Sequence, residues 1–79
     1  MTKEEVFSQL KEVLVSEFEI PAEKITLETD VFNDLELDSI DAIDLIAKMR
    51  PYLKGQVDAN MFKSVRTVQD VIDILTPLT

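Results

Sequence analysis

The hydrophobic pattern predicts a first helix from about Lys3 to Phe18. Thr2 and Glu5 have the spacing of a capping box, in which two side chains satisfy free backbone N–H groups at the start of a helix. Pro21 interrupts the pattern that follows and marks its end. The apolar residues that recur at helical spacing in between are Val6, Leu10, Val13, Leu14 and Phe18.

The next stretch, residues 19–37, predicts a long and partly packed loop. It contains apolar residues but keeps no helical or strand period. Loops of this length without regular structure are uncommon in small domains unless they are functional, so we expect apolar side chains to anchor it to the core. The expected anchors are Ile20, Ile25, Leu27, Val31, Phe32 and Leu35.

Asp38 and Ser39 predict the start of a second helix. Aspartate is a favoured N-cap residue, and the apolar pattern continues as far as Pro51, so Arg50 is the expected last residue. Apolar residues occupy two faces of this helix, so it either is wholly buried or buries one face and offers the other to a partner. One face has Ile40, Ile43 and Ala47, and the other has Leu45, Ile46 and Met49.

The C-terminal part predicts one short and one longer helix. Asp58 is the expected cap of a short helix that runs to Phe62. Thr67 and Asp70 form a further capping-box pair, and the apolar residues after Thr67 share one face until Pro77. No strand alternation or internal repeat is visible. The expected fold is all-α, a small four-helix bundle with three longer helices, one short helix and a long loop between helices one and two.

Composition narrows the possible functions. With 79 residues and 9.0 kDa, of which 46% are apolar, residues 1–79 are expected to form a single domain. The sequence has no histidine and no cysteine, which excludes Ser-His and Cys-His catalytic pairs, imidazole or thiolate zinc sites and disulfides. We therefore expect a non-catalytic protein. Without a signal-like or membrane-length apolar run, the expected location is cytoplasmic.

The charge of the chain limits the kinds of partner that it can bind. A formal net charge of −8 and a pI near 4.3 argue against nucleic acid and membrane insertion, and favour basic partner surfaces. Residues 28–44 contain seven acidic and no basic residues, a pattern typical of either a solvated or a docking surface. The alternating carboxylates do not match a calcium loop, because Ser39 replaces the required glycine and Leu45 the required glutamate. No metal site is predicted.

A motif at the start of the second helix resembles the attachment motif of acyl carrier proteins, an acidic D-L-x-x-D-S-L/I-D segment. Here it reads Asp34-Leu35-Glu36-Leu37-Asp38-Ser39-Ile40-Asp41. The resemblance covers essentially the whole chain. In this family a phosphopantetheinyl transferase moves 4′-phosphopantetheine from coenzyme A to the serine, and the terminal thiol carries acyl groups as thioesters. The resemblance implies that Ser39 is the attachment point of this covalent cofactor, with Asp38 beside it.

The same resemblance implies a docking face and an acyl pocket on a monomeric carrier. Its partners would be the transferase and acyl-transferring or acyl-modifying enzymes with basic patches. The acidic docking residues would be Asp38, Asp41 and Asp44, and their apolar centre would be Ile40, Ile43 and Ala47. The implied pocket residues are Val6, Leu10, Val31, Leu45, Ile46, Phe62, Val68 and Ile72.

Departures from the family pattern favour a specialised carrier. Glu36 stands where glycine is common, Ile40 stands where leucine is commoner, and the second helix turns basic at Lys48 and Arg50 before Pro51. We expect a role in fatty-acid, lipid or related secondary biosynthesis. The alternatives are an aminoacyl, peptidyl or polyketide carrier with the same arm, and an unmodified helical adaptor that uses only the acidic face.

Overall fold

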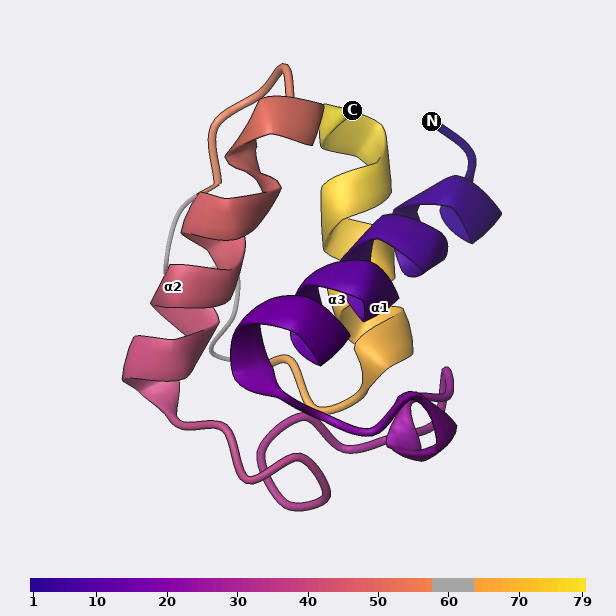
Figure 1. Cartoon of the computed structure of the whole chain (residues 1–79). Helices are drawn as coiled ribbons and strands as arrows, with labels where there is room; N and C mark the ends of the chain where they lie inside the picture. The colour runs from indigo at the N-terminus through magenta and orange to yellow at the C-terminus, as the bar shows by residue number, and fades with distance from the viewer. Residues whose placement is uncertain (58–63) are drawn as a thin grey trace.

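The computed structural model describes residues 1–57 and 64–79 and contains three α-helices (Figure 1). Helix α1 spans Lys3–Phe18, α2 spans Ser39–Met49 and α3 spans Val68–Leu75. The described residues form no strand, so the predicted all-α class is confirmed. None of the described helices is long and apolar enough to span a membrane. The predicted short helix from Asp58 to Phe62 falls outside the described residues.

Each of these α-helices begins with a capping box. The side chain of the N-cap residue accepts a hydrogen bond from the backbone N–H of the third helical residue. The side chain of that third residue accepts one from the backbone N–H of the N-cap residue. The three pairs are Thr2 with Glu5, Asp38 with Asp41, and Thr67 with Asp70. The predicted starts of all three helices are therefore confirmed. At α1, for example, the Glu5 N–H donates to Thr2 Oγ1 over 3.2 Å and the Thr2 N–H donates to Glu5 Oε1 over 2.9 Å.

The helix ends agree less uniformly with the sequence. The predicted end of α1 at Phe18 is confirmed, and Glu19 closes the helix in a left-handed conformation with φ of 55°. The predicted end of α2 at Arg50 was wrong by one residue. The Arg50 N–H donates to the Ala47 carbonyl, three residues back, so the chain tightens after Met49 into the 3-10 turn Arg50–Tyr52.

All three helices bury one face in a common core, with α1 packed against both α2 and α3. Figure 1 shows α1 crossing in front of α3, with α2 along one side of the pair. The buried helical residues are Val6, Leu10 and Leu14 of α1, Leu45, Ile46 and Met49 of α2, and Val68, Val71, Ile72 and Leu75 of α3. The loop adds Ile20, Ile25, Val31, Leu35 and Leu37 to this core.

The long loop between α1 and α2 is confirmed, and backbone hydrogen bonds tie it to the start of α3. The Val31 N–H donates to the Arg66 carbonyl over 2.8 Å, and the Val68 N–H donates to the Thr29 carbonyl over 2.9 Å. Leu27 was wrong as a buried anchor, because its side chain is 39% exposed. Instead, its carbonyl accepts from the Gln69 N–H over 3.0 Å. The loop therefore presents the start of α2 from a fixed base.

Candidate functional site

Ser39 is the first residue of α2 and is exposed to solvent. The capping box at this helix start is formed by Asp38 and Asp41, so Ser39 is not the N-cap residue. The Asp41 N–H donates to Asp38 Oδ1 over 2.9 Å, and the Asp38 N–H donates to Asp41 Oδ2 over 3.2 Å. Such a serine fits a covalent phosphopantetheine, because its oxygen is accessible and an attached phosphodiester would lie by the positive end of a helix.

A compact turn leads into this serine. Asp30 organises it, since its Oδ1 accepts from the backbone N–H groups of Phe32 and Asn33 over 2.9 and 2.8 Å. These N–H groups favour the charged form of the Asp30 carboxyl and hold its pKa below its usual value. The Asn33 N–H makes the largest contribution. The Asp30 N–H in turn donates to Asp34 Oδ2 over 2.9 Å. The acidic residues of this loop therefore shape the chain as well as charging its surface.

The outer face of α2 is apolar at its centre. Ile40 is 74% exposed and Ile43 is 57% exposed, and Ala47 continues the same row on the exposed side. Of the two alternatives, α2 is thus the helix that buries one face and offers the other. Asp44 is exposed beside this row. An apolar centre with a charged edge is the usual arrangement of a protein-binding surface.

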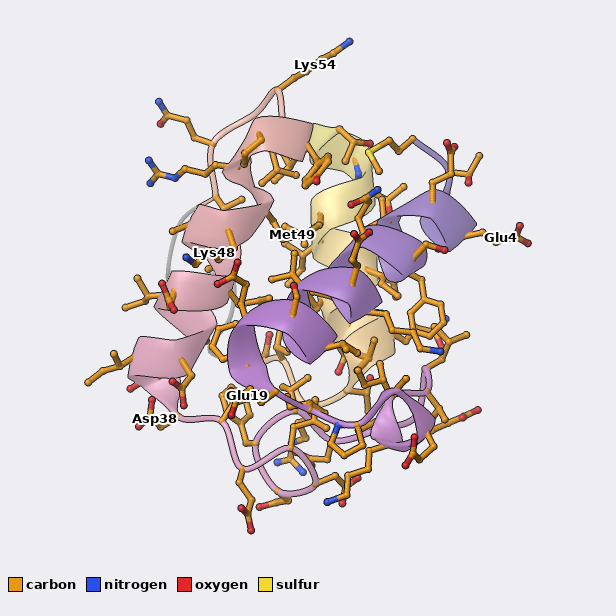
Figure 2. All side chains as sticks on the ribbon, in the orientation of Figure 1. Glu4, Glu19, Asp38, Lys48, Met49 and Lys54 are labelled. Atoms are coloured by element: carbon orange, nitrogen blue, oxygen red, sulfur yellow. The ribbon has the colours of Figure 1, made fainter. Side chains whose placement is uncertain are left out.

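Asp41 has a role that the sequence reasoning missed. Its carboxylate takes part in the capping box at the start of α2, and the residue is partly buried. The signal was available, since Asp38 and Asp41 have the N-cap and third-residue spacing that identified the other two boxes. Figure 2 shows Asp38 at the end of α2 nearest the loop. The three acidic residues predicted for docking thus differ, because the Asp44 carboxylate takes no part in this capping box.

An apolar cavity of about 10 Å³ lies behind the first turns of α2, with room for about one water molecule. Its lining includes Val31 and Leu45, two of the residues implied by the resemblance, together with Leu37 and Ala42. The implied residues Val6, Leu10, Ile46, Val68 and Ile72 are buried in the core. Phe62 lies outside the described residues. A longer apolar chain must push the surrounding side chains apart to enter here.

The distal end of α2 carries basic side chains. Lys48 Nζ lies 3.5 Å from Glu17 Oε2 of α1, and both side chains are about half-exposed. Arg50 is exposed at the following turn. In Figure 2, Lys48 lies along α2 and Lys54 projects from the end of the molecule farthest from Asp38. Only part of this positive charge is therefore free for a partner, because Lys48 already pairs with α1.

Comparison with known proteins identifies this arrangement. The family described as "Phosphopantetheine attachment site" matches residues 8–75. An acyl carrier protein from Coprothermobacter proteolyticus is 35% identical over 75 residues, covering 95% of this chain and 92% of its relative. The chain belongs to the acyl carrier protein family. Acyl carrier protein 2 from Ralstonia nicotianae is 37% identical over 78 residues, covering 99% of this chain and 96% of that protein.

Family membership decides the general chemistry of the site. Acyl carrier proteins are carriers rather than enzymes, and they hold a covalent 4′-phosphopantetheine. The carrier therefore works with a phosphopantetheinyl transferase and with enzymes that handle acyl groups. Among residues 1–57 and 64–79, no three acidic side chains gather closely enough to hold a metal ion. The acidic residues around Ser39 instead cap a helix, order a loop and charge a surface.

Proposed function

We propose that this protein carries acyl groups as thioesters on a 4′-phosphopantetheine arm attached to Ser39. The observation that carries the proposal is the exposed Ser39 hydroxyl at the first position of α2, next to a helix cap completed by Asp38 and Asp41. The other serines lack this setting. Ser8 and Ser16 lie within α1, and the Ser16 hydroxyl donates to the Glu12 carbonyl over 2.8 Å. Ser64 lies in a turn before Thr67, the N-cap of α3.

The attachment reaction needs from this chain a nucleophile and a docking surface. Ser39 Oγ forms a bond to the phosphorus of coenzyme A that bears the pantetheine. The pyrophosphate bond of coenzyme A breaks, adenosine 3′,5′-bisphosphate leaves, and the hydroxyl proton passes to a base of the transferase. This chain has no histidine or cysteine, and the carboxylates nearest to Ser39 in sequence, Asp38 and Asp41, already accept backbone N–H groups in the capping box. The transferase therefore supplies the catalysis, and the carrier supplies the accessible oxygen.

The outer face of α2 is the proposed docking surface for the transferase and for acyl-handling enzymes. Ile40, Ile43 and Ala47 form its apolar centre. Asp38, Asp41 and Asp44 give its near end a negative potential, which speeds encounter with a basic patch more than it tightens the final complex. The Asp38 and Asp41 carboxylates accept backbone N–H groups in the capping box, whereas the exposed Asp44 carboxylate is outside that box and is available for direct contact.

We assign the carrier to a specialised pathway of fatty-acid, lipid or related secondary biosynthesis. The support is the distal end of α2, where Arg50 is exposed and the helix stops before Pro51. A partner with a uniformly basic surface meets Arg50 as a like charge. Partners of this carrier therefore need a basic patch limited to the Ser39 end of α2.

A loading experiment tests the function. The protein is incubated with butyryl-coenzyme A, Mg²⁺ and a broad-specificity phosphopantetheinyl transferase, and its intact mass is measured before and after hydroxylamine treatment. We expect a gain equal to one butyryl-phosphopantetheine, followed by loss of the butyryl group alone, since hydroxylamine cleaves thioesters. No gain contradicts the carrier function and leaves the unmodified adaptor.

A further inference from the structure

Glu36 occupies the turn three residues before Ser39 and faces solvent. Its neighbours Leu35 and Leu37 are both buried, so the residue between them carries the outward side chain of the turn. Its φ is 57°, in the left-handed region that glycine adopts freely and that residues with a Cβ disfavour. The chain thus places a carboxylate at a position where a glycine would be easier to accommodate.

The backbone on both sides holds this conformation. The Leu35 N–H donates to the Asp30 carbonyl, and the Leu37 N–H donates to the Val31 carbonyl, each over 3.2 Å. Because these bonds bracket Glu36, they fix its backbone and the direction of its Cα–Cβ bond. A strained residue that its surroundings hold in place is a reason to look for a functional contact.

Glu36 also lies inside the area that a docked enzyme must cover. Three residues of extended chain span at most about 11 Å, so this is the upper limit between the Cα atoms of Glu36 and Ser39. A typical interface covers about 800 Å² per partner, equivalent to a disc of about 16 Å radius. A partner centred on Ser39 and the exposed Ile40 therefore reaches Glu36.

We propose that Glu36 is a docking residue that meets a cationic side chain of the partner enzyme on the loop side of Ser39. The acidic surface then flanks Ser39 on both sides, with Glu36 before the helix and Asp44 along it. The inference rests on the proposed modification of Ser39, and it names the partner's chemistry more closely. The fitting enzyme has a basic patch that surrounds its active-site entrance instead of lying on one side.

The test is the rate of phosphopantetheine attachment by a broad-specificity transferase, measured for matched variants. Glu36→Gln removes the charge and keeps a Cβ, whereas Glu36→Gly removes both the charge and the strain. Glu4→Gln is the charge control, because Figure 2 shows Glu4 at the opposite side of the molecule from Asp38. Glu19→Gly is the strain control, because Glu19 has nearly the same φ of 55°.

We expect both Glu36 variants to lower kcat/KM by about two- to fivefold at about 0.01 M salt, where the Debye length is about 30 Å. At about 1 M salt the Debye length falls to about 3 Å, and the variants should match the wild type. The Glu4→Gln and Glu19→Gly proteins, each of which also loses one negative charge, should slow less than the Glu36 variants at low salt and match the wild type at high salt. Circular dichroism melts verify that each variant is folded.

Three results would overturn the inference in distinguishable ways. If Glu36→Gln matches the wild type at low salt, Glu36 is not a docking residue and the modification of Ser39 stands. If only Glu36→Gly is slower, the loop conformation is responsible and the carboxylate is not. If the wild-type protein gains no arm at all, the proposed function fails together with this inference.

Discussion

Helices α1 and α2 are built alike on their buried sides and differ on their exposed sides. Both begin with a capping box, and both bury three apolar residues in the same core. The exposed side of α1 is mainly polar, with residues such as Ser8, Glu12 and Ser16. The exposed side of α2 instead presents Ile40 and Ile43.

This difference separates residues that hold the fold from residues that we propose face a partner. An exposed isoleucine gives the folded state little, because its apolar surface stays in water. Single exposed apolar residues are ordinary, but Ile40, Ile43 and Ala47 form a continuous row beside an exposed serine. The outer face of α2 is therefore best explained by contacts that form only in a complex.

The largest expected effect contrasts the core with this outer face. Leu10→Ala removes a fully buried side chain and should lower the free energy of unfolding by about 2–5 kcal/mol. Ile43→Ala should change it by less than about 0.5 kcal/mol and slow attachment of the arm. Urea unfolding and transferase kinetics measure both quantities. Equal stability losses in the two variants would remove the distinction between the helices.

The next effect concerns the buried side of α2, where the small cavity lies. Acyl chains that enter it should raise Tm, and the rise should grow with chain length. The free energy of unfolding should increase by at most about 0.8 kcal/mol per CH₂ group, because the helices must part to admit the chain. Ala42→Leu fills the cavity and should weaken the dependence on length. Thermal melts of the holo, butyryl and octanoyl forms provide the measurement. The same Tm for all three forms would mean that the acyl chain stays outside.

A smaller effect is expected from acid at the capping boxes of α1 and α3. The Thr2 N–H lowers the pKa of Glu5, and the Thr67 and Arg66 N–H groups lower the pKa of Asp70. A carboxyl whose pKa is lower in the folded state than in the unfolded state stabilises the fold at any pH above the unfolded-state pKa. This stabilisation is lost as the pH falls through the folded-state pKa. Stability should therefore decline below about pH 4.

Asp70→Asn provides the matched measurement. The variant should unfold at lower urea than the wild type at pH 7, because it loses the charge-assisted bonds at the start of α3. The gap should narrow as the pH falls below about 4, where the wild-type carboxyl becomes protonated. A gap that stays constant with pH would show that the ionisation of Asp70 does not contribute.

The smallest effect is expected at the basic end of α2. Arg50→Glu should increase turnover by general fatty-acid enzymes about two- to fivefold at low salt, because it removes a like charge facing their basic surfaces. Arg50 is preferable to Lys48, whose replacement also breaks the pair with Glu17. Enzyme assays at low and high salt give the comparison. Unchanged turnover at low salt would show that this end of α2 is a solvated surface that does not affect the choice of partner.

The sequence predicted the helices well because their information is local. Capping pairs and apolar spacing lie within a few residues, so the starts of all three helices and the buried face of α2 follow from pattern alone. The loop was harder because its attachment depends on backbone groups. Leu27 was expected to be buried, yet its carbonyl makes the attachment to Gln69 while its side chain remains exposed.

For the proposed site, the exposure of the residues was predicted more fully than the contacts that they make. The exposure of Ser39 and Ile40 follows from their positions at the start of a two-faced helix. The ion pair between Glu17 and Lys48 could not be predicted in this way, because it joins residues that are distant in sequence. The left-handed turn at Glu36 likewise depends on loop hydrogen bonds that leave no pattern in the side chains.

The most direct test is the intact mass of the wild-type protein and of Ser39→Ala after incubation with coenzyme A, Mg²⁺ and the transferase. An exposed first-turn substitution should leave Ser39→Ala folded, with a stability change of at most about 0.5–1 kcal/mol. The wild type should gain the mass of one 4′-phosphopantetheine and the variant should gain none. A gain in folded Ser39→Ala, or no gain in the wild type, would contradict the assignment of Ser39 as the attachment point.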